Sequence, residues 1–206
     1  MNSKKLWEKL AKENSMYYIN SDYGKGISGE EFERSGYEDY KRLILDDSLI
    51  TSRDTILDLG CGIGRMTKYM ADDFEMVIGT DISNTMIEFG KERLAHKDNV
   101  SLVETDGYDF SLPDSSINVV FSYIVFQHFK ERKMIKSNFQ EVYRLLKKGG
   151  IFKVRIRTDK VDLNRWWGGV EYTEQSIGKL IKKIGFEILR TEPVKDYGLW
   201  LWLKKT

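Results

Sequence analysis

Cysteine is nearly absent from this sequence, since Cys61 is the only one among 206 residues. A single cysteine excludes an internal disulfide framework and a cysteine-built metal cluster, so we expect no metal. The net charge is only +1, which gives no basic field for nucleic acid. No apolar run approaches the roughly 20 residues of a membrane span, and the N-terminus lacks the apolar core of a signal peptide. We expect a cytoplasmic protein without membrane or nucleic-acid partners.

The remaining composition is ordinary for a globular protein, with 41% hydrophobic and 32% charged residues. A chain of 206 residues suits one domain with a sizeable core. The helical spacing of apolar residues over Ser3–Asn14 and Glu30–Leu49 predicts two helices before the first strand. We expect a single domain over residues 1–206, with a helical cap at 1–50 and a core at 51–206.

The most informative stretch runs from Thr55 to Arg65, where an apolar run opens into a glycine-rich turn and then a helical pattern. A strand, a glycine turn and a helix in this order direct free backbone N–H groups and a positive helix end at a ligand. Gly60 and Gly62 permit positive φ and leave no side chain between backbone and ligand. The spacing is D-x-G-x-G-x-G, and neither reading frame completes the G-x-G-x-x-G dinucleotide fingerprint.

Polar residues follow the next three apolar runs. The first run ends at Asp81, an acid placed to accept hydrogen bonds from the two hydroxyl groups of a ribose. The second leads into Asp106 and Gly107, and the third into Ser122 and Tyr123. Ligands of open α/β sheets bind at the carboxyl ends of the strands, so these residues are candidate contacts.

At this point the chain resembles the class I S-adenosylmethionine-dependent methyltransferases. The matching segments occur in the family's order, and the resemblance covers nearly the whole chain from about Phe32 onward. The segments are Asp58–Gly64, Gly79–Ser83, Glu104–Gly107, Val119–Ser122 and Leu145–Gly150. The resemblance implies S-adenosylmethionine as the cofactor, S-adenosylhomocysteine as the product, and methyl transfer as the activity.

Apolar runs that alternate with helical patterns predict an α/β fold with a parallel sheet covered on both faces. With the resemblance, we expect a Rossmann-like three-layer sandwich. Its sheet would have seven mostly parallel strands, with the last strand antiparallel, and a helical N-terminal cap. Ser83 and Thr173 are predicted helix N-caps, Gly185 is a predicted helix stop, and Gly149-Gly150 is the predicted C-cap of the helix that contains Ile135 and Leu146.

The resemblance places the methionine and ribose parts of the cofactor around the glycine turn. Asp81 is expected at the ribose hydroxyls. Asp58 is expected either to secure the turn or to receive the methionine ammonium through water. Arg65 either pairs with the methionine carboxylate or is a solvated arginine at a helix start. Cys61 is expected to be a small filler rather than a nucleophile.

The adenine ring is expected near Asp106 and Gly107, between Ile82 and Met86, although the same residues also suit an ordinary loop and core. The segment Phe32–Gly36 resembles one that lies near the methionine end of the cofactor, or it simply packs a helix. The predicted cofactor contacts are Ser35, Asp58, Gly60, Cys61, Gly62, Arg65, Asp81, Ile82, Met86, Asp106, Gly107, Ser122 and Tyr123.

In-line methyl transfer requires positioning and the exclusion of water more than acid–base chemistry. His128 follows the fourth strand, at the edge where open α/β sheets bind ligands. It is the candidate catalytic residue, as a general base for an amine or hydroxyl near neutral pH. The alternative is a histidine that is hydrogen-bonded to the backbone and shapes the pocket.

The fifth strand is expected at Ile151–Ile156, where basic residues alternate with apolar ones. Arg157 either contacts an acceptor with a carboxylate or phosphate, or pairs with an acidic residue. Trp166 and Trp167 form a lid that shields the methyl group, or one is core and one exposed. Tyr18 lies in an aromatic, glycine-rich part of the cap. The predicted substrate contacts are Tyr18, Arg157, Trp166 and Trp167.

We therefore predict methyl transfer from S-adenosylmethionine to a nucleophilic oxygen or nitrogen of a small-molecule acceptor, because the chain has no extra domain for a macromolecule. One alternative is methylation of a protein or peptide N-terminus, which Gly62–Arg65 and His128 favour. Another is a non-catalytic subunit that binds the cofactor and regulates a partner. A nicotinamide-dependent oxidoreductase is disfavoured because the dinucleotide fingerprint fails.

Overall fold

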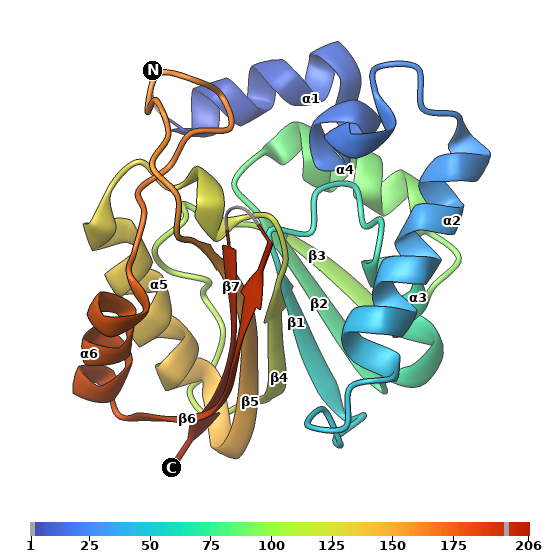
Figure 1. The fold of residues 1–206 in the computed structure, drawn as a ribbon. Helices are drawn as coiled ribbons and strands as arrows, with labels where there is room; N and C mark the ends of the chain where they lie inside the picture. The colour runs from blue at the N-terminus through green and yellow to red at the C-terminus, as the bar shows by residue number, and fades with distance from the viewer. Residues whose placement is uncertain (1–2, 196–197) are drawn as a thin grey trace. The chain divides into compact units, whose positions relative to one another are not determined.

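A computed structural model describes residues 3–195 and 198–206 of the chain. The chain divides into two compact units, Met1–Asp106 and Gly107–Thr206, and each is described by itself. Figure 1 colours the first unit from blue to green and the second from green to red. The single domain predicted for residues 1–206 stays a prediction. Met1 and Asn2, which belong to the signal-peptide argument, lie outside the described residues.

The first unit contains three parallel strands in the order β3-β2-β1. Leu57 of β1 lies opposite Ile78 of β2. Ile56, Leu57 and Val77 are fully buried, as expected for parallel strands that are covered on both faces. The elements are α1 (Ser3–Ile19), η1 (Ser21–Tyr23), α2 (Gly29–Tyr40), η2 (Lys41–Leu45), β1 (Thr55–Leu59), α3 (Thr67–Asp73), β2 (Met76–Asp81), α4 (Asn84–Arg93) and β3 (Val100–Glu104).

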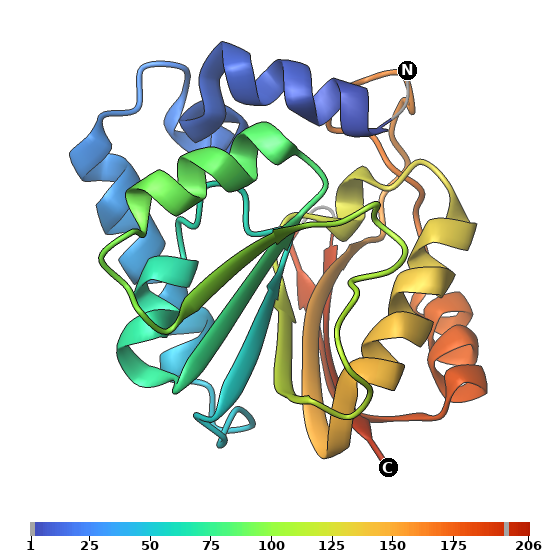
Figure 2. The same ribbon diagram turned by 180° about the vertical axis from the view of Figure 1, so that it is seen from behind.

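The cap helices differ in detail from their predicted extents. Helix α1 continues beyond Asn14, but this residue has non-helical backbone angles (φ −168°, ψ 87°) and marks a kink where the end was predicted. Figures 1 and 2 both show α1 lying across α4. The second predicted helix begins with a capping box, in which Ser28 Oγ accepts a hydrogen bond from the Glu31 N–H. It is divided into α2 and the π-helical turn η2.

The second unit contains four strands in the order β4-β5-β7-β6. Strands β4 and β5 are parallel, whereas β7 is antiparallel to both of its neighbours. The predicted mostly parallel arrangement with an antiparallel last strand is therefore confirmed. Helices α5 and α6 lie side by side in both views. The elements are β4 (Ile117–Ser122), η3 (Phe126–His128), α5 (Arg132–Leu145), β5 (Leu146–Arg157), α6 (Glu174–Ile184), β6 (Phe186–Val194) and β7 (Gly198–Lys205).

The predicted C-cap at Gly149-Gly150 is wrong. Helix α5 ends at Leu145, and Leu146 is already extended (φ −64°, ψ 139°) and pairs with Ile117 of β4. The ladder then shifts register before Ile151, so the intervening residues form an irregularity inside β5. Gly149 has a φ of 80°, which suits a strand irregularity as well as a helix end. A glycine pattern alone does not distinguish the two.

The predicted helix caps at Ser83 and Thr173 and the predicted helix stop at Gly185 are confirmed. Ser83 Oγ accepts a hydrogen bond from the Met86 N–H at 3.2 Å, and Thr173 Oγ accepts one from the Ser176 N–H at 3.1 Å. Gly185 ends α6 in the left-handed conformation, with a φ of 114°. Within the described ranges, no helix has both the length and the apolarity needed to cross a membrane.

Candidate functional site

The glycine turn between β1 and α3 is held against the end of β2. The N–H groups of Gly60 and Cys61 both donate to the Thr80 carbonyl, at 2.7 and 2.9 Å. Gly60, Gly62 and Gly64 have φ values of 81°, 56° and 78°. Side chains rarely adopt these angles, so the backbone conformation itself requires glycine at each position. At these three positions the turn presents main chain rather than side chains to its surroundings.

The space next to Gly62 is occupied by the end of α1. A Cβ atom built on Gly62 would lie 2.8 Å from Ile19 Cδ1, so the helix packs closely on the turn. On the other side, Cys61 is buried and a Cβ built on Gly79 would lie 2.9 Å from its sulfur. Burial raises the pKa of the Cys61 thiol well above its usual value. Cys61 is a neutral core filler, as predicted, and its Sγ donates a weak hydrogen bond to the Gly62 carbonyl at 3.5 Å.

Gly62→Ala is expected to destabilise the protein more than Gly149→Ala. Both residues have positive φ, which costs a side chain about 1–2 kcal/mol, but Gly149 has no atom within 4 Å of an added Cβ. Ile19 must move away from the methyl group added at position 62, which costs about 1 kcal/mol or more in addition. Urea denaturation of both variants measures the difference. Ile19→Ala in the Gly62→Ala background should recover part of it, and equal losses without recovery would contradict this packing.

Asp81 ends β2 and connects the turn to helix α4. Its Oδ2 atom accepts a hydrogen bond from the Gly62 N–H at 3.1 Å, and its Oδ1 atom accepts one from the Ser83 N–H at 2.9 Å. Burial raises the pKa of Asp81 to about 6, although these backbone hydrogen bonds oppose the rise. Each carboxylate oxygen keeps a further lone pair. The side chain is therefore oriented and still able to accept hydrogen bonds from two hydroxyl groups.

Asp58 lies in β1 and contacts the helix that follows the turn. Its Oδ2 atom accepts a hydrogen bond from Thr67 Oγ1 at 2.7 Å. Burial raises its pKa to about 6, the Thr67 hydrogen bond and the Arg65 charge lower it, and the Asp81 charge adds to the rise. Asp58 therefore joins the strand before the turn to α3 after it. Its contact with a ligand ammonium stays a prediction.

Arg65 is buried, so its interpretation as a solvated arginine is wrong. Its Nη2 donates to Asp39 Oδ2 at 2.8 Å, and its Nη1 donates to Ser35 Oγ at 3.1 Å. Ser35 Oγ also accepts from Asn20 Nδ2 at 3.2 Å. Helix α2 approaches so closely that a Cβ on Gly36 would lie 2.5 Å from the Arg65 carbonyl oxygen. Sequence reasoning missed Asp39 and Asn20, because the partners are far apart in the sequence and no local pattern predicts which residues pair.

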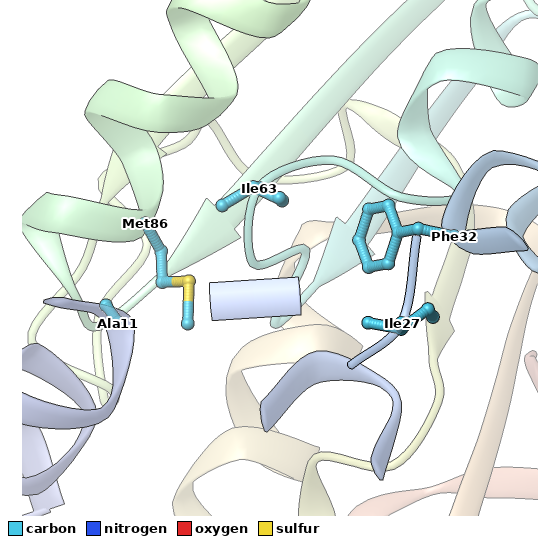
Figure 3. Packing of buried hydrophobic residues seen from close by; sticks show 5 residues of the cluster. All are labelled: Ala11, Ile27, Phe32, Ile63 and Met86. Carbon is cyan, nitrogen blue, oxygen red and sulfur yellow. The ribbon is translucent and has the colours of Figure 1, made fainter. Parts of the chain in front are cut away.

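An apolar cluster formed by five segments includes Ile63 of the turn. Figure 3 shows Met86 of α4 and Ile63 of the turn facing the same cluster as Phe32 of α2. Ile27 and Ala11 complete the buried set, and Met16 and Ile19 pack against it. Ile82 is half-buried beside Asp81. Placement of Ile82 and Met86 at an adenine ring stays a prediction, and in this structure Met86 belongs to the core.

Glu8 fastens α1 to the first turn of α4 and was not predicted. Its Oε2 accepts a hydrogen bond from Thr85 Oγ1 at 2.6 Å, and its Oε1 accepts one from the Thr85 N–H at 3.3 Å. The N–H groups of a first helical turn have no partner inside the helix, so an acidic side chain satisfies them well. Burial opposes ionisation of Glu8, but the Thr85 hydrogen bonds outweigh it and lower its pKa.

In the second unit, the residues after β4 form an unusual turn. Ser122 is buried, and the Tyr123 ring stacks on Trp200 with 5.5 Å between centroids and 19° between planes. Ile124 has a φ of 59°, which is rare for a β-branched side chain and marks backbone strain of about 1–3 kcal/mol. Strain of this kind is concentrated at functional sites. The strain at Ile124 supports the prediction that the residues at this strand end contact a ligand.

Gly107, the predicted adenine neighbour, is held by a residue that sequence reasoning missed. Its φ is 85°, and its carbonyl accepts a hydrogen bond from Asn138 Nδ2 of α5 at 2.8 Å. Asn138 also donates to the Met134 carbonyl at 2.9 Å. Asp106, which belongs to the first unit, is exposed. The signal available in the sequence was an asparagine on the apolar face of the predicted helix, next to Phe139.

His128 is buried and packs face to face with Trp166, with 6.0 Å between ring centroids and 17° between planes. Burial lowers the pKa of His128 to about 3, and the charges of Arg157 and Lys130 add to the effect. The imidazole is therefore neutral at physiological pH. A group with such a pKa accepts a hydrogen bond but is a weak proton acceptor for catalysis near pH 7.

Arg157 and Lys130 hold the loop that carries the two tryptophans. Arg157 Nη1 pairs with both oxygens of Asp159, at 2.9 and 3.0 Å, while its Nη2 donates to the Trp167 carbonyl at 3.1 Å. Lys130 Nζ donates to three carbonyls, those of Leu163, Arg165 and Gly168, at 2.6 to 2.8 Å. The acidic partner that sequence reasoning considered for Arg157 is therefore present. Its contact with an acceptor stays a prediction.

The remaining predicted acceptor contacts differ in exposure. Trp167 is exposed, whereas Trp166 is half-buried against His128. Tyr18 is half-buried in the first unit, and its hydroxyl donates to Glu13 Oε1 at 2.8 Å. Burial raises the pKa of Tyr18 to about 12, and the Glu13 hydrogen bond adds to this rise. Their roles toward an acceptor stay predictions.

Taken alone, the first unit offers what a nucleoside with a charged tail requires. Three glycines with positive φ form a turn beside an oriented carboxylate with spare acceptor capacity. The carboxylate suits two vicinal hydroxyl groups, and a turn of this kind suits a polar tail that approaches the backbone. The residues present therefore fit the cofactor that the sequence implies.

Comparison with known proteins agrees with this geometry. Residues 57–154 match a family model described as a methyltransferase domain. Phosphoethanolamine N-methyltransferase 3 of Arabidopsis thaliana is 28% identical over 95% of this chain and 40% of its own length. Sterol 24-C-methyltransferase of Eremothecium gossypii is 30% identical over 89% of this chain and 56% of its own length. The chain thus spans only about half of these curated relatives.

Solved structures share the fold. The PH0226 protein from Pyrococcus horikoshii superposes with a TM-score of 0.70 at 23% identity and covers 92% of this chain and 98% of its own. A SAM-dependent methyltransferase from Aquifex aeolicus gives a TM-score of 0.63 at 16% identity, covering 87% of this chain and 100% of its own. At these identities the likeness concerns the fold, and it confirms the predicted Rossmann-like class.

Proposed function

We propose that this chain, which carries a methyltransferase domain and uses S-adenosylmethionine as its cofactor, methylates an amine nitrogen of a small acceptor with an anionic group. The observation that carries the proposal is the Gly60–Gly64 turn, with Asp81 hydrogen-bonded to Gly62. It supports a cofactor with a ribose and a polar tail. Oxygen acceptors belong to the same predicted class, and the relatives favour nitrogen over oxygen.

The residues that would hold the cofactor are Asp81 for the ribose hydroxyls and the backbone of Gly60–Gly64 for the methionine tail. When bound, the cofactor supplies an electrophilic methyl group on a sulfonium. The chain's contribution is to orient the reacting groups and exclude water, which can lower a barrier by about 7–11 kcal/mol. Asp58 is buried and Asp81 is half-buried, which supports this role because charges act more strongly where water is excluded.

The nature of the acceptor is supported by the relatives' names and by the second unit. The Arabidopsis relative is named for the N-methylation of phosphoethanolamine, a small amine that carries a phosphate. Arg157 is the proposed contact for the anionic group, which would take the place of Asp159 on the guanidinium. Trp166 and Trp167 are proposed to cover the acceptor, and Tyr18 to contact it.

His128 is proposed to contact the acceptor nitrogen rather than to store its proton. A pKa of about 3 keeps the imidazole neutral, so its ring can accept a hydrogen bond from an ammonium group. The ammonium group would lose one proton to solvent before the transfer, which leaves a lone pair on the nitrogen. This assignment follows the pocket-shaping alternative for His128 more closely than the general-base one.

The test is turnover of purified protein with S-adenosylmethionine and phosphoethanolamine, measured as S-adenosylhomocysteine released. We expect a rate at least about 10-fold higher than with ethanolamine, which lacks the phosphate, since a bidentate charged contact contributes more than about 1.4 kcal/mol. Equal rates would overturn the anionic acceptor. Turnover only with a free peptide N-terminus would support the peptide alternative, and cofactor binding without turnover would support the regulatory one.

A further inference from the structure

Arg93 makes contacts that no motif predicted. It is the last residue of α4, and its side chain is 18% exposed. Its Nη1 donates to the carbonyl of Gly64, the last glycine of the turn, at 3.0 Å. Its Nη2 pairs with Glu33 of α2, and its guanidinium lies over the Phe32 ring at 5.5 Å from the centroid. One side chain thus contacts the turn and two residues of α2.

Glu33 is the centre of the same network. Its Oε2 accepts hydrogen bonds from Lys68 Nζ at 2.8 Å and from the Tyr69 hydroxyl at 3.0 Å, both on α3. Burial would raise the pKa of Glu33, but the hydrogen bonds from Lys68 and Arg93 outweigh it and hold the pKa below its usual value. Glu33 is therefore ionised at neutral pH. It joins α2, α3 and α4 around the far side of the turn.

The Gly64 carbonyl is the point where this network reaches the cofactor turn. It accepts the first hydrogen bond of α3, from the Lys68 N–H at 3.2 Å, as well as the bond from Arg93. Gly64 has a φ of 78°, and glycine has the largest freedom to leave such a conformation. A charged donor on its carbonyl restricts that freedom. The orientation of the adjoining peptide groups is then set before any ligand arrives.

From this geometry we infer that Arg93 is a positioning residue for the cofactor turn, and that the Arg93–Glu33 pair sets the cofactor affinity of this chain without touching the cofactor. The inference rests on the proposed function, since the ligand is S-adenosylmethionine or its product. It deepens that function by adding a determinant outside the contact set. A turn fixed in advance binds more tightly because less ordering is required on binding.

Interaction with the helix dipole is a simpler role for a basic residue at the end of α4, but it does not account for the contacts of Arg93 with Gly64 and Glu33. Basic residues near a helix C-terminus interact favourably with the helix dipole, and Lys91 in the same turn satisfies that requirement. Lys91 pairs with Glu88 of its own helix, at 3.0 Å, and both side chains are about half exposed. Lys91 is therefore a matched control, because it has the same charge, lies on the same helix and forms its ion pair within that helix.

The first experiment is calorimetric titration of S-adenosylhomocysteine into the wild type, Arg93→Met and Lys91→Met. We expect Arg93→Met to raise the dissociation constant about 10-fold and Lys91→Met to leave it unchanged. In turnover assays, the KM for S-adenosylmethionine should rise while kcat and the acceptor KM stay the same. Unchanged affinity in Arg93→Met would overturn the inference. Failure of the wild type to bind would instead overturn the proposed cofactor site.

A charge exchange separates positioning from helix pairing. The double variant Glu33→Arg, Arg93→Glu restores an ion pair between α2 and α4, but a glutamate at position 93 cannot donate to the Gly64 carbonyl. We expect thermal stability to recover relative to either single variant, while cofactor affinity stays low. Recovery of both would show that only the ion pair matters and would overturn the inference. Arg93→Lys, which retains a donor, should recover affinity at least in part.

Discussion

Replacing Asp81 by asparagine is expected to weaken S-adenosylhomocysteine binding by roughly 100-fold or more. The carboxylate oxygens accept hydrogen bonds from Gly62 and Ser83 and keep lone pairs for the ribose. An asparagine has only one acceptor oxygen, so one backbone contact and one ribose contact are lost. Hydrogen bonds to charged groups contribute about 1.5–3 kcal/mol each, and about 1.4 kcal/mol corresponds to a factor of ten. Titration calorimetry measures the loss directly.

Asp72→Asn is the matched control for Asp81→Asn. Asp72 is also a carboxylate of the first unit, but its exposed side chain pairs with Lys97 at the surface. Its replacement should leave cofactor affinity within a factor of about two, because exposed ion pairs contribute little. If Asp81→Asn bound as tightly as Asp72→Asn, the ribose would not lie on Asp81. The assignment of the glycine turn as the cofactor site would then fail as well.

Lowering the pH from 7.5 to 5 is expected to destabilise the wild type by about 2 kcal/mol relative to His128→Asn. The pKa of His128 is about 3 in the folded protein, chiefly because of burial, and near 6.5 in the unfolded chain. Between pH 6.5 and pH 3 the imidazole is protonated in the unfolded state but stays neutral in the folded state. The contribution of the neutral, buried His128 to the free energy of unfolding is therefore complete above pH 6.5 and is lost progressively toward pH 3.

The measurement is the free energy of unfolding of the wild type and of His128→Asn, obtained by urea denaturation at each pH. The difference between the two free energies tests the prediction. Asp58 and Asp81 have pKa values raised to about 6 in the folded state, so their protonation stabilises the folded protein as the pH falls. These opposite contributions are common to wild type and variant and cancel in the difference. If the difference did not change with pH, His128 would titrate normally, and the general-base interpretation would regain support.

Local rules predicted the parts of the fold that depend on neighbours in sequence. Ser83 and Thr173 cap helices because a side-chain oxygen reaches an N–H three residues later, and Gly185 ends a helix because it tolerates positive φ. The same logic failed at Gly149-Gly150, where positive φ serves a strand irregularity instead. Glycine reports the backbone angle, but not the element that needs it.

Within the site, the spacing of residues in the sequence predicted the glycine turn and Asp81. It did not predict the residues that hold the turn in place. Asp39 is 26 residues from Arg65, and Gly64 is 29 residues from Arg93. Pairs at such separations are set by how α2 and α4 pack, and a charged residue in sequence has many possible partners. The position of His128 after a strand end left two interpretations open, a general base and a histidine that shapes the pocket. It gave no sign of the stacking on Trp166, which lies 38 residues further along the chain.

The anchoring of the loop between β5 and α6 has a consequence for how this protein can change. Lys130, Arg157 and Arg132 hold the loop chiefly through main-chain carbonyl oxygens, including those of Gly168 and Glu171. Every amino acid carries a carbonyl, so most side chains of the loop can be exchanged without removing its attachment. Substitutions can therefore change the side chains that the loop presents to a ligand, while the backbone path of the loop stays the same.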